Sequence, residues 1–207
     1  IIKAGIPVIT TAANTAEVLV VIRKRAEELQ APLMVCEPER HGPEAGTYQA
    51  QNKALARLGL STILPTSVSV AALEAGLDDT VHWGRLTKWE GGNAQTFWFE
   101  AGHNPAGLNA SLDALHPHLA HPDTCIIFGI QNRKNAKDMC TILKATGLPL
   151  YYCEFDKTLA YSYTEIQTFI PGIKSFSLET LPQTPQSHVL FTGSIYFLGA
   201  LKRTLTL

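Results

Sequence analysis

The sequence predicts an α/β fold in which open, mostly parallel sheets are covered by helices. Residues 1–37 read as strand, helix and strand, an order that normally gives parallel strands joined by a right-handed crossover. Further along, four apolar runs of strand length alternate with stretches of helical pattern. Strands that are apolar throughout are typical of a parallel sheet covered on both faces. Because the helical pattern stops near residue 80, we expect two domains, 1–80 and 81–207.

The first domain opens with an expected strand at residues 6–10. Asn14 and Glu17 then have the N-cap and N3 spacing of a capping box, and apolar side chains recur at helical spacing through Leu29. The apolar run at 31–37 restores a strand. These residues therefore predict the strand–helix–strand unit.

Two more helices are expected before residue 80. In residues 46–60, alanine and leucine share one helical face, and Gly59 stands where a helix C-terminus favours a left-handed residue. Residues 66–77 begin with hydroxyl side chains suited to a cap and close on Gly76. We therefore expect each helix to end at its glycine.

The second domain is expected to contain four strands and the helices between them. The apolar runs lie at 94–100, 124–130, 148–155 and 187–193. Asn104 followed by Pro105 matches an N-cap with proline at N1, and leucines at helical spacing continue to Leu119. Asn135 and Asp138 resemble the cap and first-turn acid of a further helix. Strands and helices thus alternate as a parallel sheet requires.

The stretch FEAGHNPAG, residues 99–107, joins one of these strands to the helix after it. Ligands of open α/β sheets bind outside the carboxyl ends of the strands, where helix N-termini offer unpaired N–H groups to anions. Glu100, His103 and Asn104 are expected at such an edge. Spacing alone leaves open a structural role, in which Asn104 caps the helix and Glu100 accepts hydrogen bonds from the turn.

Composition excludes several classes of protein. With 207 residues, 45% of them hydrophobic, the chain can bury a core, which argues against a disordered or fibrous protein. A formal charge of −1 with scattered basic residues gives no footprint for nucleic acid. No apolar run reaches the roughly 20 residues that span a bilayer, and the start lacks the layout of a secretion signal. Four widely spaced cysteines, with apolar residues around Cys36 and Cys125, favour buried, reduced thiols and hence the cytoplasm.

The N-terminus is unusual because the chain opens IIKAGIPVIT, with no methionine and with two apolar residues. We expect either that a tag or leader has been removed or that the chain is part of a longer polypeptide. Composition does not choose between these two explanations.

Five short blocks, read together, resemble the folylpolyglutamate synthase and dihydrofolate synthase family of Mur-type amide ligases. IIKAGIPVIT is similar to the family's Ile-Ile-Lys-Pro-Gly segment, GTYQAQNKALA to its Gly-x-His-Gln-x-x-Asn helix, and WGRL to its Trp-Pro-Gly-Arg-Leu linker. FEAGHNPAG resembles Leu-Asp-Gly-Ala-His-Asn-Pro, and FTGSIYFLG resembles the closing Thr-Gly-Ser-Leu-Tyr-Leu-Val-Gly. The blocks follow the family's order, which is far more specific than any one of them.

The resemblance implies that residues 1–80 are the C-terminal part of the family's central ATPase domain. Residues 81–207 are then the family's C-terminal domain, a Rossmann-like, mostly parallel open sheet. The family's P-loop and magnesium ligands precede the point at which this sequence begins, and no G-x-x-x-x-G-K-[ST] motif occurs in it. ATP and Mg²⁺ are therefore implied for the parent enzyme, with their ligands expected mainly in a missing N-terminal ATPase region.

By the same resemblance, the parent enzyme adds L-glutamate to a folate or dihydropteroate carboxylate. That carboxylate takes the γ-phosphoryl group of ATP, and the glutamate amine attacks the acyl phosphate that results. The 207 residues alone are expected to be inactive, because they lack the phosphate-binding loop. The alternatives are a truncated or diverged non-catalytic α/β binding module and, less in keeping with the WGRL and TGSIYFLG blocks, another Mur-type ligase.

The family's functional residues map onto five positions of this sequence. Asn52, Arg85 and Glu100 match residues that contact ATP. Arg85 also has the permanent charge and donor fork that suit phosphoryl transfer, so Arg85 and His103 are the expected catalytic residues. His103 and Ser194 are the expected ligands of the substrate, glutamate in particular. Structural roles stay open for these residues, as a linker arginine, a cap or a helix start.

Several positions depart from the family's pattern. Tyr48 replaces the usual histidine, and Glu100 is one methylene longer than the family's aspartate, which matters where reacting groups are aligned. The Gly-Ala before the family's histidine is inverted to Ala101-Gly102. Residues 133–135 lack both acids of the family's Asp-Lys-Asp, so a structural role is expected there.

Three histidines in HPHLAHP, namely His116, His118 and His121, have a spacing that resembles a metal site. A metal site needs ligands that converge with fixed geometry and usually a fourth group. The two prolines and the expected helix end favour a solvated loop, so no metal is assigned to these residues.

Overall fold

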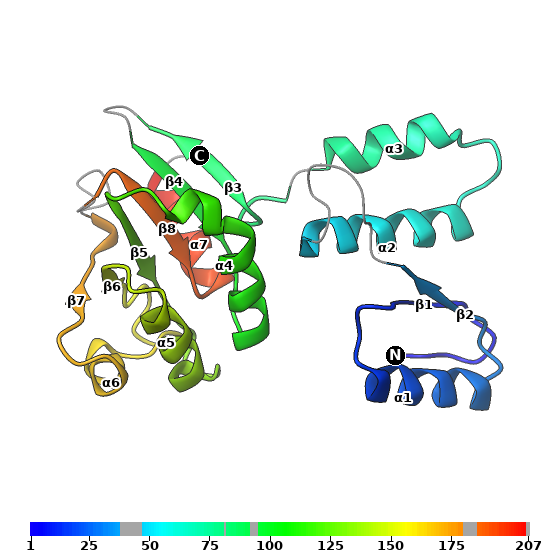
Figure 1. Ribbon diagram of the computed structural model, residues 1–207, viewed down its shortest axis with the longest axis horizontal. Helices are drawn as coiled ribbons and strands as arrows, with labels where there is room; N and C mark the ends of the chain where they lie inside the picture. Colours follow the sequence, from blue (N-terminus) through cyan, green and yellow to red (C-terminus); the bar gives the residue numbers. More distant parts are fainter. Residues whose placement is uncertain (38–46, 81, 92–94, 180–185, 206–207) are drawn as a thin grey trace. The chain divides into compact units, whose positions relative to one another are not determined.

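The computed structural model describes residues 1–37, 47–80, 82–91, 95–179 and 186–205. The chain divides into two compact units, Ile1–Val81 and His82–Leu207, drawn in blue to cyan-green and in green to red in Figure 1. Residues 46, 81 and 94, at which predicted elements or domains begin, lie outside the described residues. Within the described ranges, no helix is long and apolar enough to cross a membrane.

The first unit begins with the expected strand–helix–strand arrangement. β1 (Val8–Thr11) and β2 (Leu33–Cys36) pair in parallel, with Val8 opposite Leu33, and α1 (Ala16–Glu28) connects them. The parallel crossover predicted for the start of the sequence is confirmed.

The start of α1 differs from the expected capping box. Thr15 rather than Asn14 is the N-cap, and its side chain accepts no capping hydrogen bond. The Asn14 amide instead donates to the Thr10 hydroxyl at 2.9 Å and to the Thr11 carbonyl at 3.2 Å. The prediction of Asn14 as the cap is wrong because its amide bonds the end of β1, a local alternative that asparagine commonly takes.

Two helices complete the described part of the first unit, α2 (Tyr48–Ile63) and α3 (Val70–Asp79). Both run past the glycine that was expected to end them, since Gly59 and Gly76 lie inside the helices. The residue before Pro65 is extended, and there α2 ends, because proline disfavours helical backbone at the preceding residue. The glycine stop signals are therefore wrong, and in α2 the proline provides the stop.

The second unit contains a six-stranded sheet with the strand order β3-β4-β8-β5-β6-β7. β3 pairs antiparallel with β4, and all other neighbouring strands are parallel. The elements are β3 (Thr87–Glu90), β4 (Thr96–Glu100), α4 (Pro105–Leu119), β5 (Thr124–Phe128), α5 (Ala136–Ala145), β6 (Leu150–Tyr152), α6 (Tyr163–Phe169), β7 (Lys174–Ser175), β8 (His188–Thr192) and α7 (Ile195–Leu205). The open, mostly parallel sheet expected from the sequence is confirmed.

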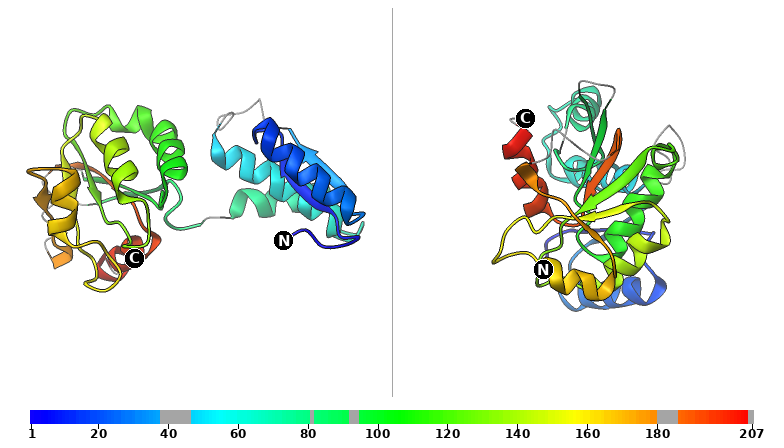
Figure 2. Two further views of the ribbon diagram at one scale, coloured as in Figure 1. Left: turned by 90° about the horizontal axis from the view of Figure 1, so that it is seen from below. Right: turned by 90° about the vertical axis from the view of Figure 1, so that its left-hand side faces the viewer.

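Helices cover both faces of this sheet, as its apolar strands require. On one face, Leu108 of α4 and Met139 of α5 pack with strand residues such as Ile126. On the other face, Phe197 of α7 packs with Phe191 of β8. Figure 2 shows the red helix α7 on the opposite side of the sheet from the green helix α4. All five residues of β5 are buried, which explains its continuous apolar sequence.

The sequence pattern does not reveal β3 and β7. Residues of β3 alternate between half-buried and exposed, and both residues of β7 are exposed. Each of the two strands lies at an edge of the sheet, where polar residues are common and an apolar run is not required.

All four cysteines are free thiols. Cys125, Cys140 and Cys153 are buried, whereas Cys36 is partly exposed, so the expectation of buried thiols holds for Cys125 and only in part for Cys36. Burial raises the pKa of each of the three buried thiols to about 12. These thiols therefore stay protonated and pack as small apolar side chains.

Two histidine rings are stacked at the amino edge of the sheet. His121 and His188 have ring centroids 3.6 Å apart at an interplanar angle of 17°. The N–H of Asp123 donates to His121 Nδ1 at 3.2 Å, and its carboxylate accepts from the Ser187 hydroxyl at 2.6 Å. Burial lowers the pKa of His188, and the nearby charges of His121 and Lys88 act in the same direction against that of Asp123. The folded state thus favours a neutral His188.

This stacked pair predicts a pH-dependent stability of the second unit. Folding lowers the pKa of His188, so the neutral ring adds to the free energy of unfolding. This stabilisation is complete above the ordinary pKa of about 6.5 and is lost as the pH falls below that value. We expect the free energy of unfolding in urea to decrease between about pH 7.5 and about pH 5.5, and to decrease less in His188→Phe. His116→Phe, which changes an exposed histidine of α4, is the control. An identical pH dependence in His188→Phe and the unaltered chain would contradict this prediction.

Candidate functional site

The carboxyl edge of the second unit's sheet is the place that the topology favours for a ligand. β8 lies between β4 and β5 in the sheet. After β8 the chain continues into α7 on one face of the sheet, whereas after β4 and β5 it continues into α4 and α5 on the other face. Ligands of open α/β sheets bind outside such a switch in direction. The residues that follow β4, β5 and β8 therefore form the candidate site.

The segments after β5 and β8 approach each other at two glycines. The Gly129 N–H donates to the Thr192 carbonyl at 3.1 Å. A Cβ on Gly193 would lie only 2.5 Å from the Gly129 carbonyl oxygen, and Gly193 has φ +100°, a conformation that side chains disfavour. The close approach therefore requires glycine at 193, two residues before the start of α7 at Ile195.

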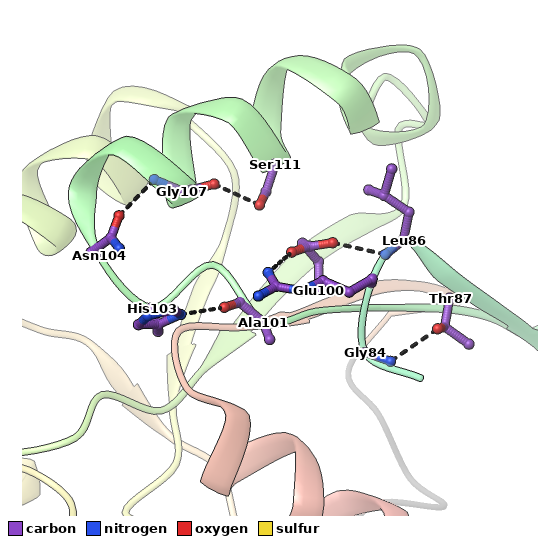
Figure 3. A network of polar contacts seen from close by, with 10 residues as sticks. Gly84, Leu86, Thr87, Glu100, Ala101, His103, Asn104, Gly107 and Ser111 are labelled. Atoms are coloured by element: carbon purple, nitrogen blue, oxygen red, sulfur yellow. Dashed lines mark hydrogen bonds and ion pairs between the residues drawn. The ribbon is translucent and has the colours of Figure 1, made fainter. Parts of the chain in front are cut away.

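Glu100, the last residue of β4, is completely buried, with 0% of its side chain exposed. Its Oε1 pairs with Nη1 of Arg85 at 3.1 Å, and its Oε2 accepts the Leu86 N–H at 2.7 Å. Figure 3 shows the Glu100 carboxylate facing the turn that carries Leu86. Arg85 keeps 34% of its side chain exposed. The structure thus brings Arg85 and Glu100 together, and the Glu100 carboxylate is bonded within the chain.

The turn that carries Arg85 has a fixed and unusual backbone. Gly84 has φ +81°, and Leu86 has φ +49°, the left-handed region that a branched side chain disfavours. The Gly84 N–H donates to the Thr87 hydroxyl at 3.0 Å. The hydrogen bond from Leu86 to the buried Glu100 offsets part of the strain at Leu86. Arg85 is therefore presented by an ordered turn.

Trp83 fastens the beginning of the same turn to the core of the second unit. Its ring lies 5.3 Å from that of Phe99 in β4, and the Lys202 ammonium of α7 lies 5.2 Å from its centroid. Such a ring contact and a cation over an indole each contribute on the order of 1 kcal/mol. The WGRL block is thus part of the packed second unit.

His103 and Asn104 occupy the corner between β4 and α4, as the sequence predicts (Figure 3). Asn104 caps α4, because its Oδ1 accepts the Gly107 N–H at 2.7 Å. Nδ1 of His103 lies 3.1 Å from the Ala101 carbonyl oxygen. Since a carbonyl only accepts, Nδ1 carries a proton, and Nε2 of the neutral ring keeps a lone pair. His103 is therefore oriented with one nitrogen as a potential base.

Ser194 is buried immediately before α7, and its Oγ accepts the Tyr196 N–H at 3.2 Å. Because β8 neighbours β4 in parallel, Ser194 and His103 lie at the same edge of the sheet. Asn52, the fifth predicted residue, lies exposed on α2 of the first unit, whereas the other four belong to the second unit.

Thr192 contributes a polar group that sequence reasoning missed. Its hydroxyl oxygen is buried and has no hydrogen-bond partner among the described residues. Thr192 is the neighbour of Glu100 on the adjacent strand, at the same carboxyl edge. Buried polar groups normally have a hydrogen-bond partner, so this hydroxyl is an exception within the buried end of β8. A threonine that ends an apolar strand gives no sequence signal for this arrangement.

The described ranges contain no group of three His, Cys, Asp or Glu side chains that could hold a metal ion. His116 and His118 lie in the last turn of α4, and the His118 ring stacks on Trp98 with centroids 4.4 Å apart. His121 stacks on His188 instead. His118 and His121 thus contact different rings, and His116 is exposed on α4.

No protein-family model matches the sequence, and no curated protein matches it. Solved structures do match. Folylpolyglutamate synthase from Thermotoga maritima is 21% identical, with a TM-score of 0.72 over 99% of this chain and 55% of its own. Folylpolyglutamate synthase from Mycobacterium tuberculosis, complexed with ADP and AMPPCP, is 15% identical, with a TM-score of 0.77 over 94% of this chain and 54% of its own. A bifunctional folylpolyglutamate and dihydrofolate synthase with Mn, AMPPNP and L-glutamate bound is 15% identical, with a TM-score of 0.79 over 99% and 54%.

The chain spans about half the length of these solved structures. Identities between 15% and 21% are low, but the TM-scores, all above 0.7, demonstrate a common arrangement of elements. The chain therefore has the fold of the folylpolyglutamate synthases over about half of their length.

Proposed function

We propose that the chain is the rear part of an ATP-dependent ligase that adds L-glutamate to a folate or dihydropteroate carboxylate. The observation that carries the proposal is the carboxyl edge of the second unit. Arg85, His103 and Ser194 lie there, paired or oriented by neighbouring groups, within the fold of folate ligases. Their side chains offer a cation, a base and a hydroxyl, which are the groups that such a reaction needs.

The reaction has two displacements. The substrate carboxylate attacks the γ-phosphorus of ATP and ADP leaves; the glutamate amine then attacks the acyl carbon, phosphate leaves, and the amine loses a proton. Arg85 donates N–H groups to phosphate oxygens and stabilises their charge. Nε2 of His103 accepts the proton that the glutamate amine loses. Ser194 and the start of α7 bind a carboxylate of the glutamate.

The nucleotide would be held mainly by a P-loop region that precedes these residues in a longer, cytoplasmic protein. We propose that Asn52 contacts the base or ribose, because its amide both donates and accepts, and that Arg85 with Glu100 forms part of the phosphate site. The exposed donors of Arg85 fit oxygen-rich anions. The Mg²⁺ ligands would come from the same preceding region.

The 207 residues by themselves are expected to show no folate-dependent turnover of ATP. A bound phosphate chain and its metal need a cradle of backbone N–H groups and carboxylates that this sequence does not supply. Release of inorganic phosphate from ATP, with and without folate and glutamate, checks the expectation. Folate-dependent release by the purified 207-residue chain would refute it.

A second candidate function is a non-catalytic α/β module that binds a small anion or a partner. The observation in its favour is the complete burial of Glu100, which replaces the acid expected to face ATP. The coding sequence upstream of Ile1 separates the two candidates. An in-frame Gly-rich phosphate-binding loop supports the ligase, and a start codon immediately before Ile1 supports the module.

A further inference from the structure

We infer that Glu100 acts on the nucleotide only through Arg85, as a positioning residue that holds the guanidinium in place for a terminal phosphate. The inference rests on the proposed function for the identity of the ligand. Its starting point is the position of the acid: no part of the Glu100 side chain reaches the surface, whereas a third of its partner does. A ligand in contact with the surface therefore meets Arg85 and not Glu100.

Both oxygens of the Glu100 carboxylate accept hydrogen bonds from within the chain, and no neutral side chain offers the same pair of acceptors. Oε1 accepts from Arg85 and Oε2 accepts from the Leu86 N–H, at 3.1 Å and 2.7 Å. Two donors from adjacent residues thus converge on one buried acceptor pair. A glutamine at this position has a single acceptor oxygen and would turn its NH₂ group toward the other donor. The carboxylate is required to hold the turn and the guanidinium at once.

The same geometry leaves Arg85 able to bind an anion. A guanidinium carries five N–H donors, and among the described residues the side chain of Arg85 makes one hydrogen bond, from Nη1 to Glu100. Its remaining donors form a rigid planar fork whose orientation is fixed once Nη1 is held and the backbone of the turn is set. The left-handed Leu86 next in the chain removes freedom from that turn. Arg85 is thus preorganised to donate to phosphate oxygens.

The first experiment measures the order of the Arg85 side chain in the 207-residue protein by NMR relaxation of its Nε–Hε group. In the unaltered chain we expect an order parameter typical of a rigid group, about 0.85, and in Glu100→Gln a value below about 0.6. Glu90→Gln is the matched control, because it breaks an exposed pair with Lys88 on β3 of the same unit. Should Glu100→Gln not fold, Glu100→Asp keeps the charge, is one bond too short for both partners, and is expected to release Arg85 as well.

The second experiment titrates ATP into the full-length gene product that contains these 207 residues, unaltered and with the same substitutions. We expect Glu100→Gln to weaken binding at least about tenfold, while Glu90→Gln binds like the unaltered chain. The positioning role is overturned if Arg85 stays ordered in both Glu100→Gln and Glu100→Asp, or if both variants bind ATP as tightly as the unaltered protein. Either result leaves the proposed function standing. Affinity that is unaffected by Arg85→Ala instead shows that the site does not bind the nucleotide, which contradicts the proposed function whatever the order of Arg85.

Discussion

Replacing Arg85 with methionine is expected to destabilise the second unit by about 2–4 kcal/mol. The change removes the guanidinium that pairs with the completely buried carboxylate of Glu100. Breaking a buried ion pair by removing one partner typically costs about 3–5 kcal/mol, and we take a smaller value because a third of Arg85 is exposed. The effect arises from the loss of charge compensation at a buried carboxylate more than from the lost hydrogen bond.

The double variant Arg85→Met/Glu100→Gln tests that reason directly. Because the side chain at position 100 is then neutral, the double variant is expected to regain most of the stability that Arg85→Met loses. Urea unfolding followed by tryptophan fluorescence is suited to the measurement, because Trp83, Trp89 and Trp98 all lie in the second unit. A double variant no more stable than Arg85→Met would show that Glu100 is not an uncompensated charge in the single variant.

Replacing Gly193 with alanine is expected to cost about 3–5 kcal/mol. The new Cβ would lie 2.5 Å from the Gly129 carbonyl oxygen, a backbone atom that cannot move without separating β5 from β8. Backbone strain at φ +100° costs about 1–3 kcal/mol, and the steric overlap costs about as much again. The start of α7 and the position of Ser194 would shift with it.

Gly147→Ala is the matched control for this substitution. Gly147 also has a positive φ, of +70°, but a Cβ there would have no neighbour within 4 Å. It is therefore expected to cost only about 1 kcal/mol, from backbone strain alone. Equal losses of stability in the two variants, again measured in urea, would show that the close approach of the two loops does not constrain position 193.

The fold could be predicted largely because the central strands are buried on both faces. β5 and β8 lie between helices, so their central residues are apolar and stand out in the sequence. β3 could not be predicted, because an edge strand with alternating polar residues has no such pattern. The ends of α2 and α3 were misplaced because an internal glycine costs a helix only about 1 kcal/mol relative to alanine, which is too little to end it.

The strand–helix corner that carries the candidate site was predicted from the sequence, but its internal contacts were not. Glu100, His103 and Asn104 are neighbours in the sequence at a strand–helix corner, which has a recognisable pattern. The contact between Arg85 and Glu100 joins residues fifteen positions apart across the unpredicted β3–β4 hairpin. Neither the burial of Glu100 nor the left-handed Leu86 has a sequence signature, since neither is marked by a local pattern of residues.

The most direct test of the central claim is the release of inorganic phosphate from ATP by the full-length gene product that contains these 207 residues. We predict release that depends on both folate and L-glutamate, and a loss of at least about 100-fold in Arg85→Ala, as expected for removal of a group that stabilises transition-state charge. Lys88→Ala, which removes an exposed cation of β3 in the same unit, should retain the full rate. Release that does not require folate and glutamate, or that is unchanged in Arg85→Ala, would contradict the account.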